Sequence, residues 1–130
     1  MSMERLQLKD ISETKTFEKY GDIFTQVRHN PETGWYLYER VKKDAPDCSH
    51  YEVVKGTKHT NPDGSVAYAY PNSERWGTNG YTIVKNWYAA ELIDFLMGRK
   101  STSAEELRNF KNNLKYPSIS SYVSRRRIFD

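Results

Sequence analysis

The longest strongly apolar segment of the chain, residues 86–98, has the periodicity of a helix. Its apolar positions recur at intervals of three and four residues, as on one face of an α-helix: Ala89, Leu92, Ile93 and Leu96. Asn86 is a residue type that caps helix N-termini, and Gly98 can adopt the left-handed conformation that ends many helices. We therefore expect a helix over 86–97 with one face packed on the rest of the chain.

Alternating large and polar residues before this helix predict β-strands. The expected strands span residues 17–20, 23–27, 35–41, 50–58, 66–70 and 81–84. Turns are expected near Gly21, at 30–34 and at 61–64, and residues 42–49 are expected to form a polar loop. The strand at 35–41 carries aromatic rings on both faces, which indicates a central strand that is covered on both sides.

A second helix is expected after the first. Ser103 and Glu106 have the spacing of a capping box, and Leu107, Phe110 and Leu114 continue an apolar face until Pro117. The predicted fold is one α+β domain over 1–130: an antiparallel meander of four or five strands packed on the first helix, with the second helix C-terminal to it. Residues 1–16 would be a loosely held leader or a short helix, 17–98 the sheet and main helix, and 99–130 a basic C-terminal helix and tail.

The amino-acid composition indicates what kind of core and which cellular location to expect. The 130 residues are 37% hydrophobic and include 10 Tyr, so much of the core must be aromatic. The single Cys48 excludes an internal disulfide, and no segment has the length or apolarity of a membrane span or signal peptide. We expect a cytoplasmic protein with no membrane contact.

The net charge of +3 is unevenly distributed, because residues 99–130 carry a basic surplus and the rest of the chain a small acidic one. Arginine and lysine side chains with nearby tyrosines suit the backbone and bases of a nucleic acid. The candidate nucleic-acid-binding residues are Lys111, Lys115, Arg125, Arg126 and Arg127. A solvated, charged tail is the alternative for the same residues.

Three short segments carry a resemblance to a known group of proteins: 38–39, 51–53 and 71–77, in which a Pro-Asn-Ser-Glu-Arg-Trp-Gly corner is the most distinctive. Over about residues 17–97 the chain resembles small, mostly uncharacterised proteins of tailed bacteriophages. The resemblance implies a phage accessory or host-interaction factor, in host cytoplasm. It implies no particular activity or site.

Candidate chemistry is sparse in the sequence. Cys48 and His50 are too few, and His29 and His59 too scattered, for the four-ligand spacing of a zinc site. Glu39 shares a predicted face with apolar residues, so a buried carboxylate could act as a general acid there. We favour the alternative that Glu39 pairs with Arg40, Lys55 or a tyrosine hydroxyl. We therefore expect no catalytic residues, no metal and no small-molecule cofactor.

The corner at Glu74, Arg75 and Trp76 is the favoured binding site, because Trp and Arg often dominate binding energy. A tryptophan before a glycine can equally close the end of a core. The sequence therefore favours a small non-catalytic binding protein with an unidentified protein partner. The alternative is a weakly specific nucleic-acid-binding protein that uses the basic C-terminal segment.

Overall fold

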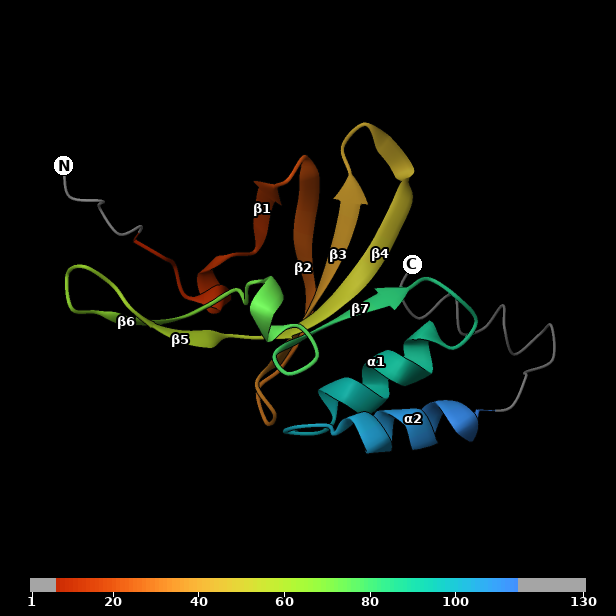
Figure 1. The fold of residues 1–130 in the computed structure, drawn as a ribbon. Coiled ribbons are helices and arrows are strands. Elements are labelled where there is room, and N and C mark those ends of the chain that lie inside the picture. Colours follow the sequence, from red (N-terminus) through yellow and green to blue (C-terminus); the bar gives the residue numbers. More distant parts are fainter. Residues whose placement is uncertain (1–6, 115–130) are drawn as a thin grey trace.

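The computed structural model describes residues 7–114 and shows an α+β fold with helices beside a sheet (Figure 1). The elements in chain order are η1 (Ile11–Glu13), β1 (Thr16–Lys19), β2 (Asp22–Asn30), β3 (Trp35–Lys42), β4 (Ala45–Lys55), β5 (Thr57–Thr60), β6 (Val66–Ala69), η2 (Ser73–Arg75), β7 (Gly80–Val84), α1 (Ala89–Met97) and α2 (Ala104–Asn112), where η denotes a 3-10 helix. Five strands form one antiparallel sheet in the order β1-β2-β3-β4-β7, which confirms the predicted fold class.

The β5–β6 hairpin forms a separate two-stranded sheet that projects away from α1 and α2 (Figure 1). Gly56 lies where the chain passes from β4 into β5, so the single strand expected over 50–58 is divided there. A Cβ at Gly56 would lie 2.6 Å from the carbonyl oxygen of Tyr68. Only glycine permits that approach, which explains why the sequence pattern breaks at this residue.

The first face of the sheet packs on α1. The buried residues of this cluster come from β3, β4, β7 and α1: Trp35, Leu37, Tyr51, Val53, Ile83, Ala89, Leu92, Ile93, Leu96 and Met97. We call this face the helix face. Its contacts include those that the periodicity of residues 89–96 predicts, and Phe95 stacks on Phe110 of α2 with ring centroids 4.4 Å apart.

The opposite face, which we call the aromatic face, is covered by the N-terminal segment and the chain between β6 and β7. Its cluster of buried residues consists of Ile11, Phe24, Tyr36, Tyr38 and Val54, with Phe17, Tyr70 and Trp76 packed against it. β3 thus lies in the middle of the sheet with both faces buried near its start, as its two rows of rings predict. The rings contact one another edge-on, as Phe17 and Tyr38 do, or stacked, as Phe17 and Phe24 do.

A bulge in β2 shifts the alternation of this strand, so that Gln26 and Arg28 lie on opposite faces although they are two residues apart. Gln26 pairs with Tyr38, and the next paired residue is Arg28, opposite Leu37, so Val27 is the extra residue. Gln26 donates a hydrogen bond to the Tyr38 hydroxyl on the aromatic face. Arg28 binds Asp94 of α1 on the helix face at 2.6 Å.

Residues 7–14 are bound to the rest of the protein more closely than a loosely held leader would be. Ile11 is buried, and the Asn61 side chain both accepts from the Leu8 amide at 2.8 Å and donates to the Leu8 carbonyl at 3.0 Å. Asp10 accepts from the Tyr68 amide at 3.0 Å, against β6. The small face of β6, Ala67 and Ala69, is buried, as expected from the alternation of that strand.

The predicted polar loop over 42–49 is wrong. Lys42 already pairs with Ala45, so only two residues join β3 and β4, and three residues bulge before Ser49 pairs with Val41. Pro46 and the polar residues around it resemble a loop in sequence, but the pairing on either side extends through them.

The two predicted helices differ from the structure only at their ends. Asn86 accepts from the Tyr88 amide in a turn, so α1 begins three residues after it, at Ala89. Gly98 has φ −82° and does not adopt the left-handed conformation. The capping box of Ser103 and Glu106 is confirmed. No helix among residues 7–114 is long and apolar enough to cross a membrane.

Candidate functional site

A cluster of charged residues lies on the aromatic face, next to the cluster of aromatic rings. Glu52 is buried in β4 with a side chain only 3% exposed, and Asp22 in β2 is 9% exposed. Arg40 lies between them, with its Nε 2.6 Å from an Asp22 oxygen and its Nη1 3.1 Å from a Glu52 oxygen. Buried carboxylates of this kind need such partners, because an unpaired charge away from water is very unfavourable.

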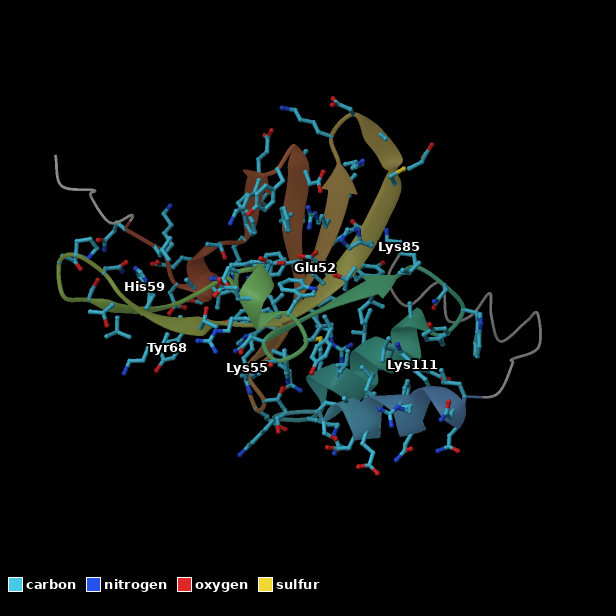
Figure 2. All side chains as sticks on the ribbon, in the orientation of Figure 1. Glu52, Lys55, His59, Tyr68, Lys85 and Lys111 are labelled. Carbon is cyan, nitrogen blue, oxygen red and sulfur yellow. The ribbon has the colours of Figure 1, made fainter. Side chains whose placement is uncertain are left out.

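Two more side chains complete the hydrogen bonding of Glu52. The Tyr70 hydroxyl donates to one oxygen of Glu52, and His50 Nε2 lies 3.2 Å from the oxygen that also binds Arg40. Both carboxylate oxygens are therefore engaged. Figure 2 shows Glu52 in the interior, within the sheet.

The register of the sheet explains why these residues meet. Tyr38 is directly opposite Glu52, and Glu52 is opposite Thr82, so the three form one row across β3, β4 and β7. Arg40 is opposite His50 in the neighbouring row. Residues two apart on a strand share a face, so both rows point to the aromatic face.

The surroundings raise the pKa values of Arg40 and Tyr70. Partial burial alone would lower the pKa of Arg40, but the hydrogen bonds from Arg40 to Asp22 and Glu52 raise that pKa overall, so the guanidinium stays charged. Burial, and then the charge of Glu52, raise the pKa of Tyr70 well above its ordinary value, so the hydroxyl keeps its proton and remains a donor.

A pocket of about 220 Å³ opens beside this cluster, and we call it the corner pocket. Its aromatic wall consists of Tyr20, Phe24, Tyr70 and Trp76. Its polar lining consists of Lys19, Arg40, Glu52, Asn72, Ser73 and Thr82, with Pro71 beside them. A wider hollow of about 580 Å³ adjoins the other side of Arg40 and Glu52, where His50 and Cys48 line it. Arg40 and Glu52 thus line both depressions and lie between them.

The backbone at Tyr20 is unusual. The turn between β1 and β2 places both central residues at positive φ, +58° for Tyr20 and +76° for Gly21. Glycine adopts this conformation freely, whereas a ring-bearing residue rarely does. The Tyr20 side chain is nevertheless 79% exposed, so burial in this structure does not explain why a tyrosine occupies the position.

Of the predicted binding corner, Trp76 lines the corner pocket. Glu74 and Arg75 are exposed in η2, and Trp76 directly after it is half-buried. Trp76 donates through Nε1 to Thr82 at 2.9 Å, and its ring covers Gly80, where a Cβ would lie 2.6 Å from ring carbons. Trp76 therefore both packs on the core and lines the pocket.

Only one of the five nucleic-acid-binding candidates, Lys111, lies among the described residues. Lys111 is exposed in the last turn of α2, and Figure 2 shows it on the outer helix, away from Glu52. The other four, Lys115, Arg125, Arg126 and Arg127, lie outside the described residues.

The expectation of a buried Glu39 is wrong, because its side chain is 33% exposed near the end of β3, where it pairs with Lys85. Pairing was the favoured alternative, although Lys85 was not among the partners considered. Within residues 7–114, no group of three or more His, Cys, Asp and Glu side chains could hold a metal ion.

The sequence did not assign Tyr20, Arg40 and Tyr70 of the corner pocket, or Asp22 of the charged cluster, to any site. Glu52 was only one of several possible acid–base groups. The alternation in β3 does place Arg40 beside Tyr36 and Tyr38, and that in β4 places Glu52 beside Val54. Arg40 and Glu52 are thus charged residues on a strand face that is otherwise apolar, and this pattern could have indicated a buried charged cluster.

Comparisons of the chain with protein-family models, with curated proteins and with solved structures found no match.

Proposed function

We propose that this protein is a small binding protein that captures a protein partner at the corner formed by Glu74, Arg75 and Trp76 and at the adjoining corner pocket. The position of Trp76 carries the proposal. Its ring is anchored by Thr82 and Gly80 yet lines an open pocket, next to two exposed charged residues. A rigid, partly exposed aromatic ring gives contact area at little cost in conformational entropy.

The state of Glu52 supports binding rather than catalysis as the role of the site. Glu52 is the buried carboxylate closest to the pocket, but Tyr70, Arg40 and His50 already occupy its oxygens. A general base must be within hydrogen-bond reach of the proton that it abstracts. Glu52 would have to give up a partner before it could act on a substrate.

The resemblance to tailed-phage proteins supports a partner among host or phage proteins, met in the host cytoplasm. A tagged protein would be incubated with host extract at about half-molar salt, where the Debye length is only about 4 Å and surface charge pairs are screened. Capture through a desolvated aromatic contact should survive these conditions.

Matched variants test whether capture of the partner depends on the residues of the corner. Trp76→Ala removes the ring, and Arg75→Glu changes an exposed residue that the core does not need. Both should lose the partner. Tyr68→Ala removes an exposed tyrosine from the β5–β6 hairpin and should retain it. Unchanged capture by both corner variants, with folding verified by circular dichroism, would contradict the proposal.

The nucleic-acid alternative predicts a different result. If Arg125, Arg126 and Arg127 bind phosphates, replacing all three with Ala should weaken DNA or RNA binding regardless of sequence. The slope of log affinity against log salt should fall by up to about three ion contacts. Tight binding to a nucleic-acid probe at low salt, together with loss of partner capture at high salt, would place this alternative first.

A further inference from the structure

The hydrogen-bonding groups of the corner pocket are unequally used. Its carboxylate and side-chain amide acceptors are occupied: Glu52 accepts from Tyr70, Arg40 and His50, and the Asn72 side-chain oxygen accepts from the Glu74 amide. Its donors are not all used. A guanidinium has five N–H groups, and the contacts of Arg40 to Asp22 and Glu52 involve Nε and Nη1. A ligand that complements this pocket therefore supplies acceptors, such as carbonyl oxygens.

The charges of the pocket disfavour a charged ligand. The Arg40 guanidinium lies 4.8 Å from the centre of the Phe24 ring, so a cation of the protein itself already occupies that aromatic surface. A lysine or arginine from a partner would be repelled by it. An anionic group would lose its hydration without meeting a net positive charge, because Asp22 and Glu52 balance Arg40 and the lining residue Lys19. A neutral group meets neither penalty.

The rings and the size of the pocket specify the ligand further. Tyr20 and Trp76 reach the pocket from different segments, the β1–β2 turn and the corner after η2. Drug-sized ligands occupy cavities of about 300 Å³ or more, so a pocket of about 220 Å³ suits one ring with a short piece of backbone.

We propose that the corner pocket binds a proline-containing, extended segment of the protein partner. A proline ring is neutral and packs on aromatic faces, and the polyproline II backbone has no internal hydrogen bonds, so its carbonyls are free to accept. The proline ring packs between Tyr20 and Trp76, and the neighbouring carbonyls accept from Arg40 and the Asn72 side-chain amide. This inference rests on the proposed function and names the chemistry of the partner.

The proposal also accounts for the unusual tyrosine in the β1–β2 turn. Asn and Gly are the residues that favour positive φ in such turns. An exposed tyrosine there gains no burial from the protein itself, whereas a ligand ring packed on it would provide a reason for its presence.

The test uses the full chain, labelled with nitrogen-15, and two capped synthetic peptides: six prolines, and six alanines as the matched control. Addition of the proline peptide should shift the indole N–H resonance of Trp76, which Trp76→Phe identifies by its disappearance, and the side-chain resonances of Arg40 and Asn72. The alanine peptide should shift these resonances at least about tenfold more weakly at equal concentration, because it lacks the aromatic contact.

Tyr20→Asn separates a binding role from a structural one. Asparagine tolerates positive φ, so this variant should melt at the same or a higher temperature than the wild type while losing about tenfold in affinity for the proline peptide. Tyr68→Ala should bind as the wild type does.

Three results would overturn the inference: no shift with the proline peptide at millimolar concentration, equal shifts with the alanine peptide, or full affinity in Tyr20→Asn. If the peptide fails while partner capture still depends on Trp76 and Arg75, only the ligand chemistry is wrong. If capture is independent of both residues, the proposed function itself is wrong.

Discussion

The two faces of the sheet are held by different forces. The helix face buries aliphatic and aromatic side chains against α1, and its stability comes mainly from removing apolar surface from water. The aromatic face also buries rings, but it continues into Asp22, Arg40 and Glu52, whose burial is tolerable only while all three are paired. The stability of the helix face therefore depends on how much apolar side-chain volume is buried, whereas that of the aromatic face also depends on the pairing of buried charges. Substitutions on each face of the sheet can test this difference.

The largest expected effect is on the charged cluster. Arg40→Ala leaves Asp22 and Glu52 buried without their shared partner and should reduce the free energy of unfolding by about 3–5 kcal/mol at pH 7. Urea denaturation of wild type and variant at pH 7 measures this loss.

The control for that experiment is Lys43→Ala, which breaks an ion pair with Glu18 in which both side chains are more than half exposed. It should cost at most about 1 kcal/mol. If Arg40→Ala costs no more than Lys43→Ala, the aromatic face does not depend on the cluster.

On the helix face, Leu92→Ala should cost about 2–5 kcal/mol through lost burial and a residual cavity. Leu92 is 6% exposed, in the middle of the buried side of α1. Here the loss should be nearly independent of pH, since no titrating group is uncovered. Asp94→Ala on the same helix removes only an exposed pair with Arg28 and serves as the control. Equal urea midpoints for the two variants would mean that burial on this face contributes little.

A smaller effect is expected where the N-terminal segment meets β6. The hydrogen bond from the Tyr68 amide is the main cause that lowers the pKa of Asp10 below its ordinary 3.8. A lowered folded-state pKa contributes stability that is present above the unfolded pKa and is lost as the pH falls through the folded pKa.

Asp10→Asn should therefore be less stable than the wild type at pH 6, with a difference that narrows as the pH falls below about 4. Thermal melts of both proteins between these pH values measure the difference. A constant gap across the range would show that the charge of Asp10 is not what holds this segment.

Much of the helix face follows from local pattern. The spacing of Leu92, Ile93 and Leu96, the rings of β3 and the capping box at Ser103 each depend on residues close in sequence. The charged cluster does not, because Asp22, Arg40 and Glu52 come from three strands whose register decides which side chains meet.

The attachment of residues 7–14 was equally beyond local pattern. Asn61 holds the backbone of Leu8 across 53 positions of sequence, and nothing in the spacing of either residue signals the other. The short β3–β4 connection was hidden for a related reason, since Pro46 marks a loop locally while strand pairing around it decides otherwise.

The bulge at Val27 changes how β2 tolerates a change in length. Removing one residue from a regular strand sends every later side chain to the opposite face. In β2 the pairing already passes directly from Gln26 to Arg28, so a chain lacking Val27 could pair regularly and leave Arg28 opposite Leu37. Val27 is also half exposed, so little burial would be lost. A β2 strand that is one residue shorter is therefore compatible with the same sheet, provided that the deleted residue is Val27, which packs on neither face.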